Sequence, residues 1–142
     1  IKRGTAMHNV LAMVTDTDSL HNAVRKAEHS HLITSQEAPQ IEKQLKERIS
    51  YPNVRQWFSG YKRILCERPI GLGDGSTERP DRVVWTADGY VDIIDYKFGK
   101  ERPKEYNKQV RSYMRHLTDM GYDKVRGYIW YVDTGIVRHV LL

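Results

Sequence analysis

The order of the secondary-structure signals predicts an α/β domain with a central mixed β-sheet flanked by helices and preceded by a helical segment. Residues 1–59 are mainly helical in pattern, whereas residues 60–142 alternate with the period of strands around one long amphipathic stretch. The order is helices, three strands, a helix and two strands, and a helix placed between strands can carry the chain back across one sheet face. We therefore expect the chain of 142 residues to be one domain with a helical part and a sheet part.

The helical part shows apolar residues at helical spacing together with capping signals. A short helix is predicted from Gly4 to Ala12, and a second follows the possible caps at residues 16–19. Thr34 and Glu37 have the spacing of a capping box, and they precede a third apolar stripe that Pro52 ends.

The sheet part contains five stretches with the alternation or the apolar content of strands. They lie at about 61–70, 80–86, 90–97, 125–132 and 136–141. The long helix between the third and fourth strands is predicted to begin near Pro103 and to stop at Gly121, a residue suited to the left-handed position after a helix.

Composition excludes several classes of protein. No apolar run approaches the length of a membrane-spanning helix, so we expect no membrane association. Cys66 is the only cysteine, which excludes an internal disulfide or a thiolate-built cluster and favours the cytoplasm. The formal net charge of +5 fits a polyanionic partner but is weak evidence alone. The first residues lack an initiator Met and an apolar leader, so we expect a fragment of a longer protein.

Two predicted strands, residues 80–86 and 90–97, are separated by turn residues that end in Gly89. If the loop is Ala87-Asp88-Gly89 with Gly89 at positive φ, antiparallel pairing places Asp81 directly opposite Asp95. A two-residue loop would instead pair Asp81 with Tyr96, and a bulge could also shift the register.

Directly opposed carboxylates on one sheet face repel each other and need a nearby positive charge. Lys97 projects from the same face, and a divalent cation would neutralise the pair more completely. Alternatively, Asp81 and Asp95 only flank a core hairpin whose ends reach water. The apolar residues on both faces of 90–97 favour a buried central strand, where unpaired charges are costly. Asp92 points to the opposite face and is expected to be solvated or locally paired.

The order Pro80-Asp81, a spacer and Asp95-Tyr96-Lys97 resembles the signature of the PD-(D/E)XK nucleases. The surrounding residues resemble more specifically the RecB/AddA-type nuclease domain at the C-terminus of UvrD-like helicase–nuclease subunits. The matching features are His8 on an upstream helix, Glu67 at the end of the preceding strand, Asp-Arg-Val at 81–83, and Gln109 with Tyr113 on the following helix. The resemblance implies a restriction-endonuclease-like core.

The resemblance also implies a metal site and a catalytic lysine. His8, Asp81 and Asp95 would ligate Mg²⁺, with Mn²⁺ as an acceptable alternative, and the backbone carbonyl of Tyr96 would complete the site. Lys97 would orient or activate the attacking water and stabilise charge on the phosphate. The alternatives are that His8 is a partly buried helix histidine and that Lys97 is a surface counter-charge.

Three further residues are catalytic candidates with structural alternatives. Gln109 and Tyr113 share a helix face and could contact the phosphate or hold Lys97, or they could belong to the edge and the core of an apolar stripe. Glu67 could contact metal through water or pair with Arg68 or Arg82. Basic residues suit a phosphate backbone or form a solvated helix face, namely Lys100, Arg102, Lys104, Lys108, Arg111 and Arg115.

The predicted function is that of a metal-dependent deoxyribonuclease, acting as an exonuclease or endonuclease. The resemblance implies double-strand-break end processing and recombinational repair, with DNA as substrate and a helicase upstream in the same polypeptide. A second helicase–nuclease subunit is a further candidate partner. The chain lacks the cysteines of an iron–sulfur cluster and the Walker A pattern of an ATP site. The alternatives are a catalytically weak DNA-docking or structural module and a stand-alone restriction or repair endonuclease.

Overall fold

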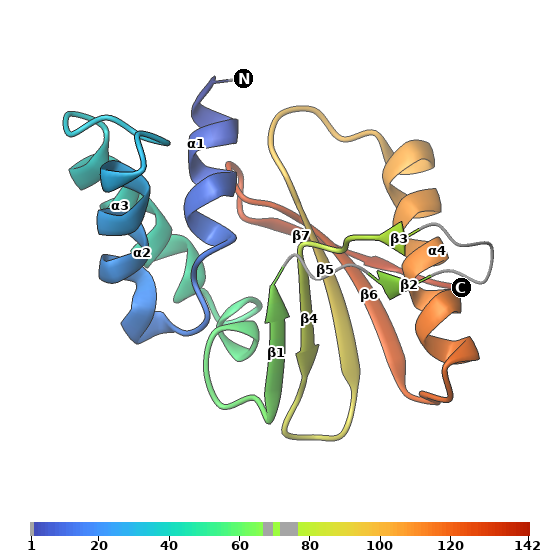
Figure 1. Ribbon diagram of the computed structural model, residues 1–142. Helices are drawn as coiled ribbons and strands as arrows, with labels where there is room; N and C mark the ends of the chain where they lie inside the picture. The colour runs from blue at the N-terminus through green and yellow to red at the C-terminus, as the bar shows by residue number, and fades with distance from the viewer. Residues whose placement is uncertain (1, 67–69, 72–76) are drawn as a thin grey trace. The chain divides into compact units, whose positions relative to one another are not determined.

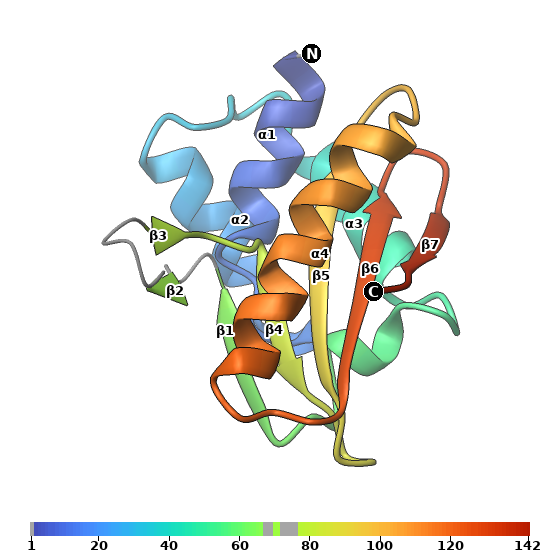
Figure 2. The same cartoon turned by 90° about the vertical axis from the view of Figure 1, so that its right-hand side faces the viewer.

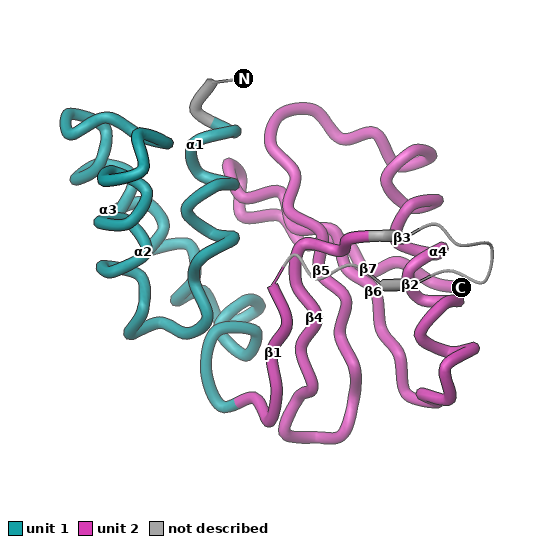
Figure 3. Tube along the Cα trace, viewed as in Figure 1, with its two compact units in different colours: residues 1–60 teal, residues 61–142 magenta. Residues whose placement is uncertain are grey.

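The structure is a computed structural model that describes residues 2–66, 70–71 and 77–142. The chain divides into two compact units, residues 1–60 and 61–142, drawn in teal and magenta in Figure 3. This boundary coincides with the change from helical to strand-like sequence pattern near Gly60. Whether the two units together form the single predicted domain stays a prediction, and each is described separately below.

Unit 1 consists of helices, as its sequence pattern predicts (Figure 1). They are α1 (Lys2–Leu11), the short 3-10 helix η1 (Thr17–Ser19), α2 (Leu20–His29), α3 (Ala38–Ile49) and the short 3-10 helix η2 (Arg55–Trp57). The predicted capping box before α3 is present, because the Thr34 amide donates to Glu37 Oε1 at 2.8 Å and the Glu37 amide donates to Thr34 Oγ1 at 3.0 Å.

Unit 2 is built on a five-stranded mixed sheet with the strand order β1-β4-β5-β6-β7. Its strands are β1 (Arg63–Cys66), β4 (Arg82–Trp85), β5 (Val91–Lys97), β6 (Val125–Tyr131) and β7 (Ile136–Val140). β5 and β6 are parallel, and the other neighbouring pairs are antiparallel. The prediction of a central mixed sheet is confirmed, and β5 is its middle strand.

The first strand differs from the prediction of 61–70. The described part of β1 is Arg63–Cys66. Ile70–Gly71 (β2), which includes the last residue of the predicted strand, pairs instead with Thr77–Glu78 (β3) in a separate two-stranded sheet that the sequence pattern did not predict.

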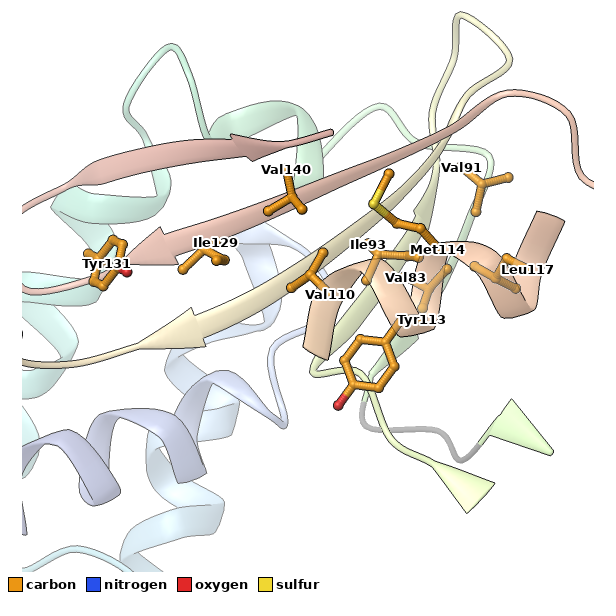
Figure 4. Close-up of a cluster of buried hydrophobic side chains, with 10 residues drawn as sticks. All are labelled: Val83, Val91, Ile93, Val110, Tyr113, Met114, Leu117, Ile129, Tyr131 and Val140. Atoms are coloured by element: carbon orange, nitrogen blue, oxygen red, sulfur yellow. The ribbon is translucent and has the colours of Figure 1, made fainter. Parts of the chain in front are cut away.

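Helix α4 (Pro103–Asp119) connects the parallel strands β5 and β6 and lies along one face of the sheet (Figure 2). It ends as predicted, because Gly121 adopts a φ of 109° just beyond it. Its apolar side packs on side chains of β4 to β7 in the core shown in Figure 4. The helix residues of this core are Val110, Tyr113, Met114 and Leu117.

The middle strand is buried on both faces, as its apolar sequence predicts. Ile93 faces the α4 core, and Ile94, which points the other way, is also fully buried. A charged group on this strand is therefore held in a low-dielectric environment. Among the helices that the structure describes, none is both long and apolar enough to cross a membrane.

Candidate active site

The β4–β5 hairpin has the register that the three-residue loop predicts. Val83 pairs with Ile93, and Trp85 pairs with Val91. The Thr86 amide donates to the Tyr90 carbonyl at 2.9 Å, and Gly89 adopts a φ of 91°. The two-residue loop and the shifted register are therefore excluded.

This register brings Asp81 beside Asp95 at the end of the hairpin. The paired residues Arg82 and Ile94 immediately precede that point, so continuing the ladder by one residue opposes the two aspartates. The Tyr96 amide also donates to Asp81 Oδ2 at 2.7 Å, which fixes the first carboxylate against β5. Both aspartates are buried, with 8% of Asp81 and 3% of Asp95 exposed.

The surroundings of Asp95 disfavour its ionised form. Burial, followed by the interaction with the neighbouring Asp81 carboxyl, raises the pKa of Asp95 from 3.8 to about 7, although Lys97 acts in the opposite direction. Ionising both carboxylates together is thus unfavourable unless a cation joins them.

Lys97 reaches the carboxylates from the same strand. Its Nζ lies 2.8 Å from Asp95 Oδ2 and 3.2 Å from Gln109 Oε1 on α4, to which it donates a hydrogen bond. The ammonium also lies 4.5 Å from the centre of the Tyr106 ring, at cation–π distance. An acidic, an amide and an aromatic side chain thus hold the lysine beside the two carboxylates.

The two carboxylates fit a hard divalent cation. Carboxylate oxygens are the ligands that Mg²⁺ prefers, and two buried carboxyls in contact need positive charge. Asp95 Oδ2 is buried and, despite its short distance to Lys97, has no partner in hydrogen-bond geometry among the described residues. The described part of the chain contains no group of three or more His, Cys, Asp or Glu placed for a metal, so further ligands stay a prediction.

The other predicted site residues are His8, Glu67, Tyr96 and Tyr113. His8 lies on α1 of unit 1, and its role as a ligand stays a prediction, as does that of the Tyr96 carbonyl. Glu67 lies outside the described residues. Tyr113 is a buried core residue whose hydroxyl donates to the Arg79 carbonyl at 3.5 Å, so it contacts the backbone that leads into Asp81.

Asp92 belongs to the opposite face of the sheet, as its position in the strand predicts. It lies beside Arg126 of β6, whose Nε and a terminal nitrogen donate to its two oxygens at 2.6 and 3.0 Å. It is only 1% exposed, so it is locally paired and not solvated.

Two residues near the site have contacts that were not predicted. Tyr106 was not a site candidate, and Arg82 was considered only within the Asp-Arg-Val motif and as a partner of Glu67. Tyr106 precedes Gln109 by three helical positions, a spacing that places both on one side of α4 and that could have indicated the lysine contact. Arg82 is fully buried and donates to the Tyr96 hydroxyl at 3.4 Å and to Cys66 Sγ at 3.5 Å. The sequence pattern could have indicated these contacts, because an arginine inside an apolar strand is expected to be buried and a buried guanidinium requires partners.

A comparison with protein-family models gave a match over most of the chain. The family model described as the PD-(D/E)XK nuclease superfamily matches residues 1–140, nearly the whole chain. A comparison with curated protein sequences gave no significant match.

Proposed function

Since this chain belongs to the PD-(D/E)XK nuclease superfamily, we propose that it is a metal-dependent deoxyribonuclease that hydrolyses phosphodiester bonds in DNA. The observation that carries the proposal is the contact between the buried carboxylates of Asp81 and Asp95, with the ammonium of Lys97 held 2.8 Å from the second. The superfamily supports nuclease activity in general, and deoxyribonuclease specificity is our narrower proposal.

Each side chain has a defined task in this proposal. A divalent cation bound by Asp81 and Asp95 would polarise a phosphoryl oxygen and acidify the attacking water. Asp81 is held in place by the Tyr96 amide, so the carboxylate is oriented before substrate arrives. His8, the Tyr96 carbonyl and Glu67 are proposed to complete the cation's surroundings.

Lys97 supplies positive charge where negative charge develops on the phosphate. Gln109 accepts a hydrogen bond from its ammonium and Tyr106 lies beside it, so these two side chains position the lysine. Tyr113 positions the segment before Asp81 through the Arg79 carbonyl.

The biological setting is also part of the proposal. The resemblance to RecB/AddA-type domains supports cytoplasmic action on DNA ends delivered by a helicase in the same polypeptide, during double-strand-break processing and recombinational repair. The cation is proposed to be Mg²⁺, with Mn²⁺ as a substitute, because oxygen ligands suit both ions.

Hydrolysis of linear single-stranded DNA with Mg²⁺ or Mn²⁺ tests the proposal. Asp95→Asn and Lys97→Met should each abolish the activity, whereas the exposed control variants Asp123→Asn and Lys43→Met should retain it. DNA cleavage that persists in both site variants would refute the catalytic assignment. Absence of cleavage by the unaltered protein with either ion would favour a DNA-docking module instead.

Calorimetric titration with Mn²⁺ tests the ligands independently of activity. The unaltered protein should bind the ion, and Asp95→Asn should bind it much more weakly. His8→Ala should weaken binding to an intermediate extent if the histidine is a ligand, and unchanged affinity in that variant would remove it from the metal site.

A further inference from the structure

The ammonium of Lys97 has contacts of two kinds, one with a candidate metal ligand on its own strand and two with α4. Its Nζ lies 2.8 Å from Asp95 Oδ2, a contact without hydrogen-bond geometry. It also donates a hydrogen bond to Gln109 Oε1 at 3.2 Å and lies 4.5 Å from the centre of the Tyr106 ring. Two of its contacts therefore do not depend on Asp95.

Asp95 Oδ2 is the atom for which Lys97 and a divalent cation would compete. It is buried and has no partner in hydrogen-bond geometry within the described part of the chain. Carboxylate oxygens are the ligands that Mg²⁺ prefers. A divalent cation and an ammonium at one buried oxygen would repel each other strongly, because buried surroundings screen charge poorly. Binding of the cation to this oxygen therefore requires the ammonium to withdraw.

Tyr106 and Gln109 form a place for the withdrawn ammonium, which we call the lysine seat. They are three positions apart and so lie on the same side of α4. Tyr106 is half-buried, and its ring centre lies 6.3 Å from that of Tyr131, the last residue of β6 (Figure 4). Tyr131 is buried and pairs with Lys97 in the parallel ladder. The seat is therefore held against the sheet by a buried side chain.

The lysine seat suits a cation that has lost its carboxylate partner. The face of an aromatic ring attracts an ammonium, and the amide oxygen of a glutamine accepts one of its hydrogens. The Lys97 side chain is 21% exposed, so water can solvate the rest of the ammonium. Withdrawal from Asp95 therefore loses one ion pair and retains both contacts with α4.

We propose that Lys97 is a displaceable counter-ion, which pairs with Asp95 in the metal-free protein and withdraws onto Tyr106 and Gln109 when a divalent cation binds. This inference rests on the proposed function, because it takes Asp95 as a metal ligand. It adds that Tyr106 is a positioning residue whose ring affects the affinity for the ion through the ammonium. It also follows that Lys97 weakens metal binding although the proposed reaction needs it.

Calorimetric titration of the whole chain with Mn²⁺, without DNA and at one fixed pH, tests this exchange. Lys97→Met should bind the ion about tenfold more tightly, since no ammonium has to leave Oδ2. Tyr106→Leu should bind it about two- to fivefold more weakly, because an ammonium without a carboxylate partner depends more on the ring. Tyr106→Phe retains the ring and should bind the ion as the unaltered protein does.

A double variant separates this coupling from a loss of packing. In the Lys97→Met background, Tyr106→Leu should leave the affinity for Mn²⁺ unchanged, because no ammonium is present to occupy the seat. Lys124→Met and Tyr90→Leu are the matched controls. In this second pair the ammonium lies 5.7 Å from the ring centre, just before the start of β6 and β5 and so at the end opposite to Lys97. Neither control should change the affinity.

Gln109→Ala gives the same test at an exposed position if Tyr106→Leu folds poorly. It should weaken Mn²⁺ binding in the unaltered background and leave it unchanged in the Lys97→Met background.

Equal weakening by Tyr106→Leu or Gln109→Ala with and without Lys97 would show a merely structural role and would overturn the inference. An affinity for Mn²⁺ that Lys97→Met leaves unchanged or lowers would also overturn it. Either result, with DNA still cleaved by the unaltered protein, leaves the proposed nuclease function intact. If the expected coupling is measured but the unaltered protein cleaves no DNA, the nuclease proposal fails and the exchange stands.

Discussion

Replacing Asp95 by Asn should stabilise the metal-free protein at mildly alkaline pH. The substitution preserves the size of the side chain and removes its negative charge. In the unaltered protein, burial and the adjacent Asp81 raise the pKa of Asp95 to about 7, so ionisation of this carboxyl opposes folding.

The size and the pH range of the effect follow from the pKa. A rise from 3.8 to about 7 corresponds to a loss of up to about 4 kcal/mol of unfolding free energy, at 1.36 kcal/mol per pH unit. The unfolded chain releases the Asp95 proton near pH 3.8, whereas the folded chain keeps it until about pH 7. Stability is therefore fully present below pH 3.8 and is lost as pH rises through about 7.

Urea unfolding of both proteins without metal, at about pH 5 and about pH 8, measures this difference. The unfolding free energy of Asp95→Asn relative to the unaltered protein should increase between the two conditions. Added Mg²⁺ at the higher pH should stabilise the unaltered protein and have little effect on the variant. A free-energy difference that is the same at both pH values would refute the account of two repelling carboxyls.

Three further substitutions test the packing of the sheet and the position of the lysine. Gly127→Ala should lower the unfolding free energy, measured by urea unfolding, by about 1–3 kcal/mol. The reason is that the added Cβ would lie 2.7 Å from Val110 Cγ1 and closer still to Met114 Sδ. An unchanged unfolding free energy would contradict the close approach of β6 and α4. Arg126→Ala should lower the unfolding free energy by about 3 kcal/mol in the same measurement, because it leaves the Asp92 carboxylate buried without its bidentate partner. DNA cleavage per folded molecule should stay constant. Gln109→Ala should lower kcat about tenfold without a change in thermal midpoint, because an exposed hydrogen bond to the ammonium of Lys97, which we propose to be catalytic, is lost. An unchanged kcat would show that the amide does not position the lysine.

The hairpin could be predicted because its local signals agree. Gly89 can adopt the positive φ that closes a three-residue loop, and the period-two alternation then fixes which residues are opposed. The position of Asp81 beside Asp95 follows from these short-range rules alone. The ends of α4 could also be predicted from the sequence, because proline is preferred in the first turn of a helix and glycine just after its end. Pro103 and Gly121 occupy these positions.

The contacts of the long side chains could not be predicted from the sequence in the same way. Lys97 can adopt many rotamers, and its contact with Tyr106 depends on how α4 packs against β5, which no local pattern specifies. The small β2–β3 sheet was missed because two-residue strands have too few positions to show alternation. The place of His8 depends on how two compact units are arranged, a long-range property that helical periodicity does not contain.

Asp92 and Asp95 show which property of a buried carboxylate indicates chemistry. Both lie on β5, and both are almost fully buried. Asp92 has a guanidinium that donates to both of its oxygens, so its charge is satisfied within the protein and its role is structural. Burial, and then the second carboxyl beside it, raise the pKa of Asp95, and a lysine compensates only part of this effect. A fold that needed only stability would place an apolar residue or a paired arginine at that position, since either avoids the electrostatic cost. A divalent cation bound by both carboxylates, as proposed above, would remove this cost, so the feature that destabilises the protein without metal would also give the site affinity for the ion.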